Sequence, residues 1–319
     1  MSTHVTAPAA DFEEHRPRMF GIAYRMLGSA AEAEDTVQEA YLRWSSADRG
    51  AIEHPGAWLA KVVTRLCLTH LTSARARREE YVGAWLPEPV LTGGGALGPM
   101  ESAQQRDSVS MALLVLLEQL TPVERAVYVL REAFAYGHRD IAALLDLSEP
   151  NCRQLYRRAA ARVAAGQETA GDGKGGADQE GGTGRDGGAA REPRFQPEPE
   201  RWRSLVDTFL SAARTGDLTR LEGLLAADVR YVADGGGVVG AARRPILGRD
   251  KVARFVIGAL GKYAAGLPVG VAEVNGAPAL LFGDTAVLLV QFDNGLVSGV
   301  QAVVNPEKLA FLRRQLSHS

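Results

Sequence analysis

The segment 120–163 reads LTPVERAVYVLREAFAYGHRDIAALLDLSEPNCRQLYRRAAARV and predicts two short helices joined by a tight turn. Gly137 to Leu145 forms the first helix, and Asp146-Leu147 is the connection. Ser148 can cap the next helix, whose first turn tolerates Pro150. The segment therefore predicts a helix-turn-helix.

The second helix of this motif has one apolar face and one basic face. Cys152, Leu155 and Tyr156 share a face because they are three and four residues apart. The opposite face carries residues that can read DNA, namely Asn151, Arg153, Gln154, Arg157 and Arg158. Arginine suits guanine, Asn and Gln suit adenine, and further arginines suit phosphates. The alternative is a solvated basic face on an ordinary helical hairpin.

The charge of the chain is unevenly distributed. Its formal net charge is −2, yet the stretches 61–78 and 151–165 hold only basic charges. The first of these stretches has Lys61, Thr64 and Arg65 on a helix that begins near Trp58, and it ends in a cluster formed by Arg75, Arg77 and Arg78. Such a mixture can hold an unstacked base and its backbone. A charged helix end is the alternative for this stretch.

The first half of the chain reads as helical throughout, and its breaks divide the sequence into parts. The predicted parts are a helical module at 11–80, a linker at 81–107, a second helical module with the helix-turn-helix at 108–165, a glycine-rich tether at 166–200 and a further domain at 201–316. The predicted fold is thus multidomain, with two all-α modules followed by an α+β domain.

The last domain mixes helical and strand patterns. Its predicted helices are Trp202–Arg214, Leu218–Ala226, Asp250–Tyr263 and Glu307–Leu316. Its predicted strands are Val229–Val232, Val238–Ala242, Val269–Val274, Ala279–Phe282, Thr285–Phe292 and Leu296–Val304. Asn294-Gly295 between the last two strands is a strong hairpin signal.

Three segments in one order resemble a known family, the extracytoplasmic-function sigma factors. GSAAEAEDTVQEAYLRWSSAD, from residue 28, is similar to the conserved helix of the family's region 2. AWLAKVVTRLCLTHLTSARARR, from residue 57, is similar to its promoter-melting segment, and the opening segment 120–163 is similar to its region 4.

The chain also resembles the subgroup of this family that carries a C-terminal SnoaL-like domain, a cone-shaped α+β barrel. The motifs are YVGAWLPEPV at 81–90, DGGG at Asp234, Gly235, Gly236 and Gly237, and NPEKL at Asn305, Pro306, Glu307, Lys308 and Leu309. Two departures stand out. Val238 occupies a position where the subgroup usually has Lys, and the tether is unusually long.

The resemblance implies a promoter-selectivity subunit that binds core RNA polymerase and promoter DNA. Its polymerase-binding residues would be Asp35, Gln38, Glu39 and Leu42. Its −10 contacts would be Trp58, Lys61, Thr64, Arg65, Arg75, Arg77 and Arg78. Its −35 contacts would be Asn151, Arg153, Gln154, Arg157 and Arg158. The C-terminal domain would regulate these modules through DGGG, NPEKL and the linker residues Trp85, Leu86 and Pro87.

Other functions remain open at this level. The C-terminal domain could be an active isomerase or cyclase with Asp234 as general base, or it could bind an unidentified small molecule. The DGGG glycines could also simply form a turn with positive φ, and NPEKL could simply begin the last helix. A plain helix-turn-helix regulator is a further alternative. No cofactor or metal is predicted.

The remaining features suggest where the protein works. Cys67 and Cys152 lie in amphipathic helical patterns without metal-ligand spacing, so core packing in a reducing compartment is predicted. No apolar run is long enough to span a bilayer, and residues 1–10 lack the layout of a signal peptide. The sequence therefore predicts a cytoplasmic protein.

Overall fold

The structure is a computed structural model that describes residues 8–92, 108–169 and 199–317. The first helical module contains α1 (Pro8–Leu27), α2 (Ala30–Ser46), a 3-10 turn (Arg49–Ala51) and α3 (Pro55–Glu79). Ser29 caps α2 by accepting a hydrogen bond from the Glu32 backbone N–H. The apolar faces of the three α-helices meet around large buried side chains such as Tyr24 and Trp44.

The second helical module contains α5 (Met111–Leu117), α6 (Pro122–Glu132), α7 (His138–Leu145) and α8 (Glu149–Thr169). Thr121 and Glu124 form a capping box at the start of α6. The turn after α7 is closed by Asp146, whose φ of 55° places it in the left-handed region. The predicted helix-turn-helix is therefore present as α7 and α8.

The C-terminal domain is a six-stranded sheet with helices on both of its faces. Its strands are β1 (Leu225–Asp234), β2 (Ile246–Leu247), β3 (Val269–Val274), β4 (Ala277–Phe282), β5 (Ala286–Asp293) and β6 (Leu296–Val303). They lie in the order β2-β1-β6-β5-β4-β3, and β1 and β6 are parallel whereas the other neighbours are antiparallel. The helices are α9 (Pro199–Thr215), α10 (Leu218–Leu224), α11 (Arg249–Tyr263) and α12 (Ala310–Ser317).

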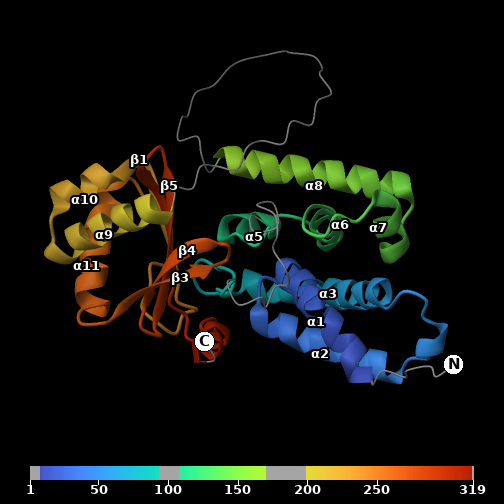
Figure 1. Ribbon diagram of the computed structural model, residues 1–319. Helices are drawn as coiled ribbons and strands as arrows, with labels where there is room; N and C mark the ends of the chain where they lie inside the picture. The colour runs from blue at the N-terminus through green and yellow to red at the C-terminus, as the bar shows by residue number, and fades with distance from the viewer. Residues whose placement is uncertain (1–7, 93–107, 170–198, 318–319) are drawn as a thin grey trace, which may run out of the picture.

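The sheet buries both of its faces. Figure 1 shows α9, α10 and α11 gathered on the side that faces away from the helical modules, where a core forms around Phe209 and Phe282. The other face packs against Leu86 of the linker, Met111 of α5 and Leu312 of α12. A separate hydrophobic core, shared by this face of the sheet, the linker and α5, thus joins the C-terminal domain to the rest of the chain.

Two predictions for the C-terminal domain were wrong. Val238–Ala242 was expected to be a strand, but it leaves a turn at Val238 and continues without regular structure. The turn forms because Gly236 and Gly237 have positive φ and the backbone N–H groups of Val238 and Val239 donate to the Gly235 carbonyl. The last helix was expected from Glu307, but it begins at Ala310. The residues from Pro306 to Leu309 form a turn that directs Lys308 inward.

The predicted tether at 166–200 falls almost wholly outside the described residues, as does the part of the predicted linker from 93 to 107. Within the described part of the chain, no helix combines the length and the apolar character that a membrane span requires.

Candidate functional site

A buried polar site surrounds Asp234, whose side chain is fully buried at the end of β1. Its Oδ1 accepts a hydrogen bond from the Tyr81 hydroxyl at 2.5 Å, and its Oδ2 accepts one from the Leu86 backbone N–H at 2.8 Å. Lys308 Nζ lies 2.7 Å from the same Oδ2. A single carboxylate therefore joins the linker to the motif NPEKL.

The pairing of β1 with β6 explains why DGGG and NPEKL meet. These strands are parallel and in register at Asp234 and Val303, so both motifs leave the sheet at the same edge. The backbone N–H groups of Val304 and Asn305 then donate to the Asp234 carbonyl at 2.9 and 3.0 Å. Two motifs far apart in the sequence become one structure.

Asn305 and Lys308 complete the site around the aromatic residues of the linker. Asn305 Nδ2 donates to the Tyr81 hydroxyl at 2.9 Å. Lys308 Nζ donates to the Leu86 carbonyl at 2.5 Å and lies 4.2 Å from the centroid of the Trp85 ring. The buried ammonium thus has a carboxylate, a carbonyl and an aromatic face as partners, which offsets the loss of its hydration.

Gly236 is required in this site by both conformation and space. Its φ is +61°, and its N–H donates to Asp234 Oδ1 at 3.1 Å. A Cβ added there would lie 2.7 Å from Asn305 Cγ. DGGG therefore forms a turn with positive φ that also packs against Asn305 of NPEKL, and its regulatory role stays a prediction.

Alkaline pH is expected to weaken this site. Burial, followed by the hydrogen bond to Asp234, raises the pKa of Tyr81 well above its ordinary value. The folded chain then keeps a proton that the unfolded chain releases, so this stabilisation is complete below about pH 10 and is lost as the pH rises toward the folded pKa. The measurement is the free energy of unfolding against pH. Tyr81→Phe should flatten the fall of this free energy at alkaline pH, and Tyr263→Phe, at an exposed ring, is the control. The same alkaline fall in both variants would contradict this assignment.

The linker is also fixed to the first helical module, through Glu88. The Ser29 hydroxyl donates to Glu88 Oε1 at 2.7 Å, and the N–H groups of Ala30 and Ala31 donate to Oε2 at 2.9 and 3.1 Å. The carboxylate therefore lies at the N-terminus of α2, where the helix dipole favours negative charge. Burial nevertheless raises the pKa of Glu88, against the hydrogen bonds that lower it.

Asn275 forms a third connection, at the tip of the hairpin between β3 and β4. Its Nδ2 donates to the Tyr24 hydroxyl at 2.6 Å and to the Val109 carbonyl at 2.9 Å, and its Oδ1 accepts from the Val90 N–H at 3.2 Å. Next to it, Leu91 pairs with Val274 at the edge of the sheet. One buried amide thus contacts the first helical module, the linker and the segment that enters α5.

Glu88 and Asn275 were not singled out by sequence reasoning. Glu88 lies inside the quoted motif YVGAWLPEPV, but nothing in the motif reveals that its partner is the start of α2. Asn275 precedes Gly276 between two strands, a pattern that signals a hairpin turn. The signal gives the positive φ of 53° but not the buried contacts of its side chain.

The predicted polymerase-binding residues lie along α2 and face solvent. Asp35 and Gln38 are exposed, and Leu42 is 60% exposed, which is unusual for a large apolar side chain in this molecule. Glu39 pairs with Arg43 at 2.7 Å. The four residues form one continuous accessible face, which stays a predicted docking surface.

The predicted −10 residues lie on α3 but not in one environment. Trp58 is half-buried against Trp44, with ring centroids 5.7 Å apart, and Thr64 is fully buried with its hydroxyl donating to the Ala60 carbonyl. Thr64 would therefore reach DNA only after a rearrangement. Lys61 and Arg65 are accessible, and both contact Asp146 of the second helical module. The side chains of Arg75, Arg77 and Arg78 lie outside the described residues.

The predicted −35 residues all lie on the exposed face of α8. Cys152 and Leu155 are buried on the opposite face, as their spacing predicted. The exposed set is Asn151, Arg153, Gln154, Arg157 and Arg158. Two of its arginines already have acidic neighbours, since Arg153 lies 2.5 Å from Glu149 and Arg158 lies 3.4 Å from Glu124. This face of α8 is therefore accessible to a DNA groove, and its −35 role stays a prediction.

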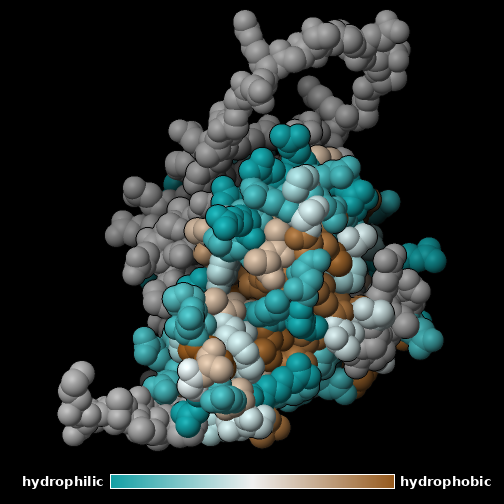
Figure 2. All heavy atoms as spheres, turned by 90° about the vertical axis from the view of Figure 1, so that its right-hand side faces the viewer, coloured by the Kyte–Doolittle hydropathy of each residue, from teal (hydrophilic) through white to brown (hydrophobic). Residues whose placement is uncertain are grey.

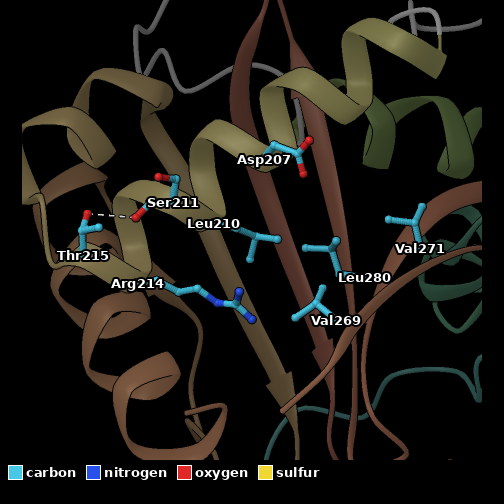
Figure 3. Close-up of a pocket in the computed structure, with 8 residues that line it drawn as sticks. All are labelled: Asp207, Leu210, Ser211, Arg214, Thr215, Val269, Val271 and Leu280. Atoms are coloured by element: carbon cyan, nitrogen blue, oxygen red, sulfur yellow. Dashed lines mark hydrogen bonds between the residues drawn. The ribbon is translucent and has the colours of Figure 1, made fainter. Parts of the chain in front are cut away.

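A groove of about 510 Å³ lies on the helix side of the sheet, away from Asp234. Figure 3 shows that Asp207, Leu210 and Arg214 project from α9 over residues of β3 and β4. Asp234 does not line this groove, so the proposed general base and the groove are separate. Among the residues that the structure describes, no cluster of His, Cys, Asp and Glu could hold a metal ion.

Comparison with known proteins matches both helical modules. The Sigma-70 region 2 family matches residues 12–77, and the Sigma-70 region 4 family matches residues 110–163. The ECF RNA polymerase sigma factor SigJ of Mycobacterium tuberculosis is 38% identical over 259 residues, which cover 81% of this chain and 75% of that protein. A protein of the same organism named "Probable ECF RNA polymerase sigma factor SigI" is 31% identical and covers 99% of both chains.

The solved structures include a relative of the whole molecule. The crystal structure of SigJ from Mycobacterium tuberculosis has a TM-score of 0.69 and 31% identity, and the match covers 95% of this chain and 98% of that chain. Two helical modules of these families define a promoter-binding subunit of RNA polymerase. The chain belongs to the extracytoplasmic-function sigma factors, and it combines regions 2 and 4 with a SnoaL-like C-terminal domain.

Proposed function

We propose that this sigma factor is restrained in cis by its C-terminal domain, which holds the linker and thereby fixes both helical modules. The carboxylate of Asp234 carries the proposal, because it is buried and bonded to Tyr81, Leu86 and Lys308 at once. The linker is bonded to α2 through Glu88 on its other side. Because the C-terminal domain binds the linker, it controls how far the two helical modules can separate.

The residue roles follow the accessible faces. Asp35, Gln38, Glu39 and Leu42 would dock on core RNA polymerase, and the exposed residues of α8 would read the −35 element. Lys61 and Arg65 would engage the −10 element, with Trp58 and the arginines at the end of α3. Contacts of these lysine and arginine side chains with DNA phosphates supply affinity. Contacts with the edges of the DNA bases supply selectivity. Work on RNA polymerase would place the protein in the cytoplasm.

An isomerase or cyclase activity is less consistent with the contacts of Asp234. A general base needs a free lone pair within reach of a substrate proton. Asp234 Oδ2 accepts from Leu86 and Lys308, and Oδ1 accepts from Tyr81 and Gly236. The linker therefore occupies the position that a substrate would need, which supports a binding role for this carboxylate.

Run-off transcription with core RNA polymerase tests the proposal. A chain that ends at Ala165 should yield several times more transcript than the full chain. The full-length variant Tyr81→Phe should move in the same direction, because one lost hydrogen bond of about 1 kcal/mol changes an equilibrium roughly fivefold. Tyr263→Phe, at an exposed ring, is the matched control. Equal transcript from the full chain, the shortened chain and Tyr81→Phe would contradict restraint by this domain.

A further inference from the structure

The groove on the helix side of the sheet has an apolar floor that is open to solvent. Leu210 of α9 and Leu280 of β4 are buried at its base. Val271 of β3 lies directly opposite Leu280 in the register of the two strands, so both side chains point to the same face. Val271 is nevertheless 50% exposed. A ligand that covers this valine would remove apolar surface from water, which favours binding.

Two side chains of opposite charge stand on the rim of the groove. Asp207 and Arg214 project from α9 on the side that faces β3 and β4 (Figure 3). They share this side because seven residues are two turns of helix, which places them about 10 Å apart along the axis. Both are exposed, and neither has an ion-pair partner among the residues that the structure describes.

The other properties of the groove make these two charges the main source of selectivity. The Thr215 hydroxyl donates to the Ser211 carbonyl at 2.9 Å, so it is already used within α9. The volume of about 510 Å³ lies in the range of small-molecule sites, roughly 300–1,000 Å³. The groove therefore offers an apolar floor between an anionic and a cationic end.

We propose that this groove binds a small molecule with a carboxylate at one end, an ammonium group at the other and an apolar chain between them. The carboxylate pairs with the guanidinium of Arg214, which can donate two parallel hydrogen bonds to it. The chain covers Val271 and Leu280, and the ammonium group pairs with Asp207. A fatty acid would leave Asp207 without a partner, and a diamine would bring a cation beside Arg214. The site is separate from Asp234, so it does not rest on restraint by the C-terminal domain.

The groove lies on the part of the molecule that is far from the helical modules. Figure 1 shows α9 on the side of the sheet that faces away from them. Figure 2 shows the opposite end, which the helical modules form, and hydrophobic side chains gather in the middle of that face. An apolar chain can bind to such a surface as well. A test of the groove must therefore depend on the two charged ends of the ligand.

Isothermal titration calorimetry of the full-length protein tests the proposal with ω-aminooctanoate. Its extended chain separates the two charges by a distance similar to that between Asp207 and Arg214. Octanoate and octylamine have the same chain but lack one charged end each, and γ-aminobutyrate has both ends but is too short. The first probe should bind about tenfold more tightly than each of the others, the scale of one charge-assisted hydrogen bond. Equal affinities, or no binding of ω-aminooctanoate, would overturn the proposal.

Variants of the full-length protein assign each end of the probe to its residue. Arg214→Gln should weaken ω-aminooctanoate about tenfold without weakening octylamine, and Asp207→Asn should weaken it about tenfold without weakening octanoate. Val271→Thr keeps a β-branched residue in the strand and should weaken all the probes with the longer chain. Arg220→Gln and Asp228→Asn are the controls, because they remove the same charges from exposed positions outside the groove. If Arg214→Gln binds ω-aminooctanoate as Arg220→Gln does, the probe binds elsewhere and the groove is not its site.

Discussion

Asp234→Asn is expected to lower the free energy of unfolding by about 3–5 kcal/mol, the cost of leaving a buried charge without its counter-ion. Lys308 is 7% exposed and would keep its ammonium beside an amide. The amide also has only one oxygen to accept the hydrogen bonds that now come from Tyr81, Leu86 and Gly236. Urea denaturation followed by tryptophan fluorescence measures the loss, and the probe is well placed because Lys308 lies against the Trp85 ring.

Two further variants separate the charge from the packing. Asp228→Asn removes an exposed carboxylate from the same strand and should change the stability by less than about 0.5 kcal/mol. Adding Lys308→Met to Asp234→Asn removes the orphaned charge and should restore part of the loss. If Asp234→Asn and Asp228→Asn unfold at the same urea concentration, the buried pair does not stabilise the fold. Transcription by Asp234→Asn should exceed that of the wild type if the linker is released.

Gly236→Ala is expected to cost about 2–5 kcal/mol through two additive causes. A residue with Cβ pays roughly 1–2 kcal/mol in the left-handed region, and overpacking adds about 1–3 kcal/mol. The new methyl group would lie against the Asn305 amide and 3.2 Å from the Tyr81 hydroxyl. Both side chains would have to move, so the hydrogen bond between them would break. Thermal unfolding and run-off transcription measure the two consequences.

Gly258→Ala is the matched control for this substitution. Gly258 lies inside α11, and a Cβ there would meet no heavy atom within 4 Å. Alanine should therefore stabilise the helix by roughly 1 kcal/mol. A loss of stability in Gly236→Ala that is no greater than the change in Gly258→Ala would show that the DGGG turn tolerates a side chain. The opposite signs expected for one chemical change make the pair informative.

The local elements of the fold were largely predictable because their signals lie within a few residues. Ser148 before Glu149 and the spacing of Cys152 and Leu155 give the position and the buried face of α8. The prediction failed at Val238–Ala242, where β-branched residues follow three glycines. There the positive φ of Gly236 and Gly237 outweighs the strand propensity of the valines.

The candidate site was only partly predictable, because its partners are distant in sequence. The motifs DGGG, NPEKL and WLPEP could be named from the resemblance, but not the carboxylate of Asp234 as the atom that joins them. Likewise, the sequence places Lys61 and Arg65 on a basic helix, and Asp146 in a turn. Only the packing of α3 near α7 brings these charges together.

The covering of the second sheet face has a consequence for any open form of the molecule. Leu86 and Met111 shield the buried side chains of Val287, Leu289 and Val303. If the linker departs, these residues become a bare apolar surface, and surfaces of this kind promote self-association. A released C-terminal domain would therefore tend to self-associate through this face of the sheet. Release of the linker is therefore expected to require another surface that covers this sheet face, supplied by the polymerase or by a second copy of the chain.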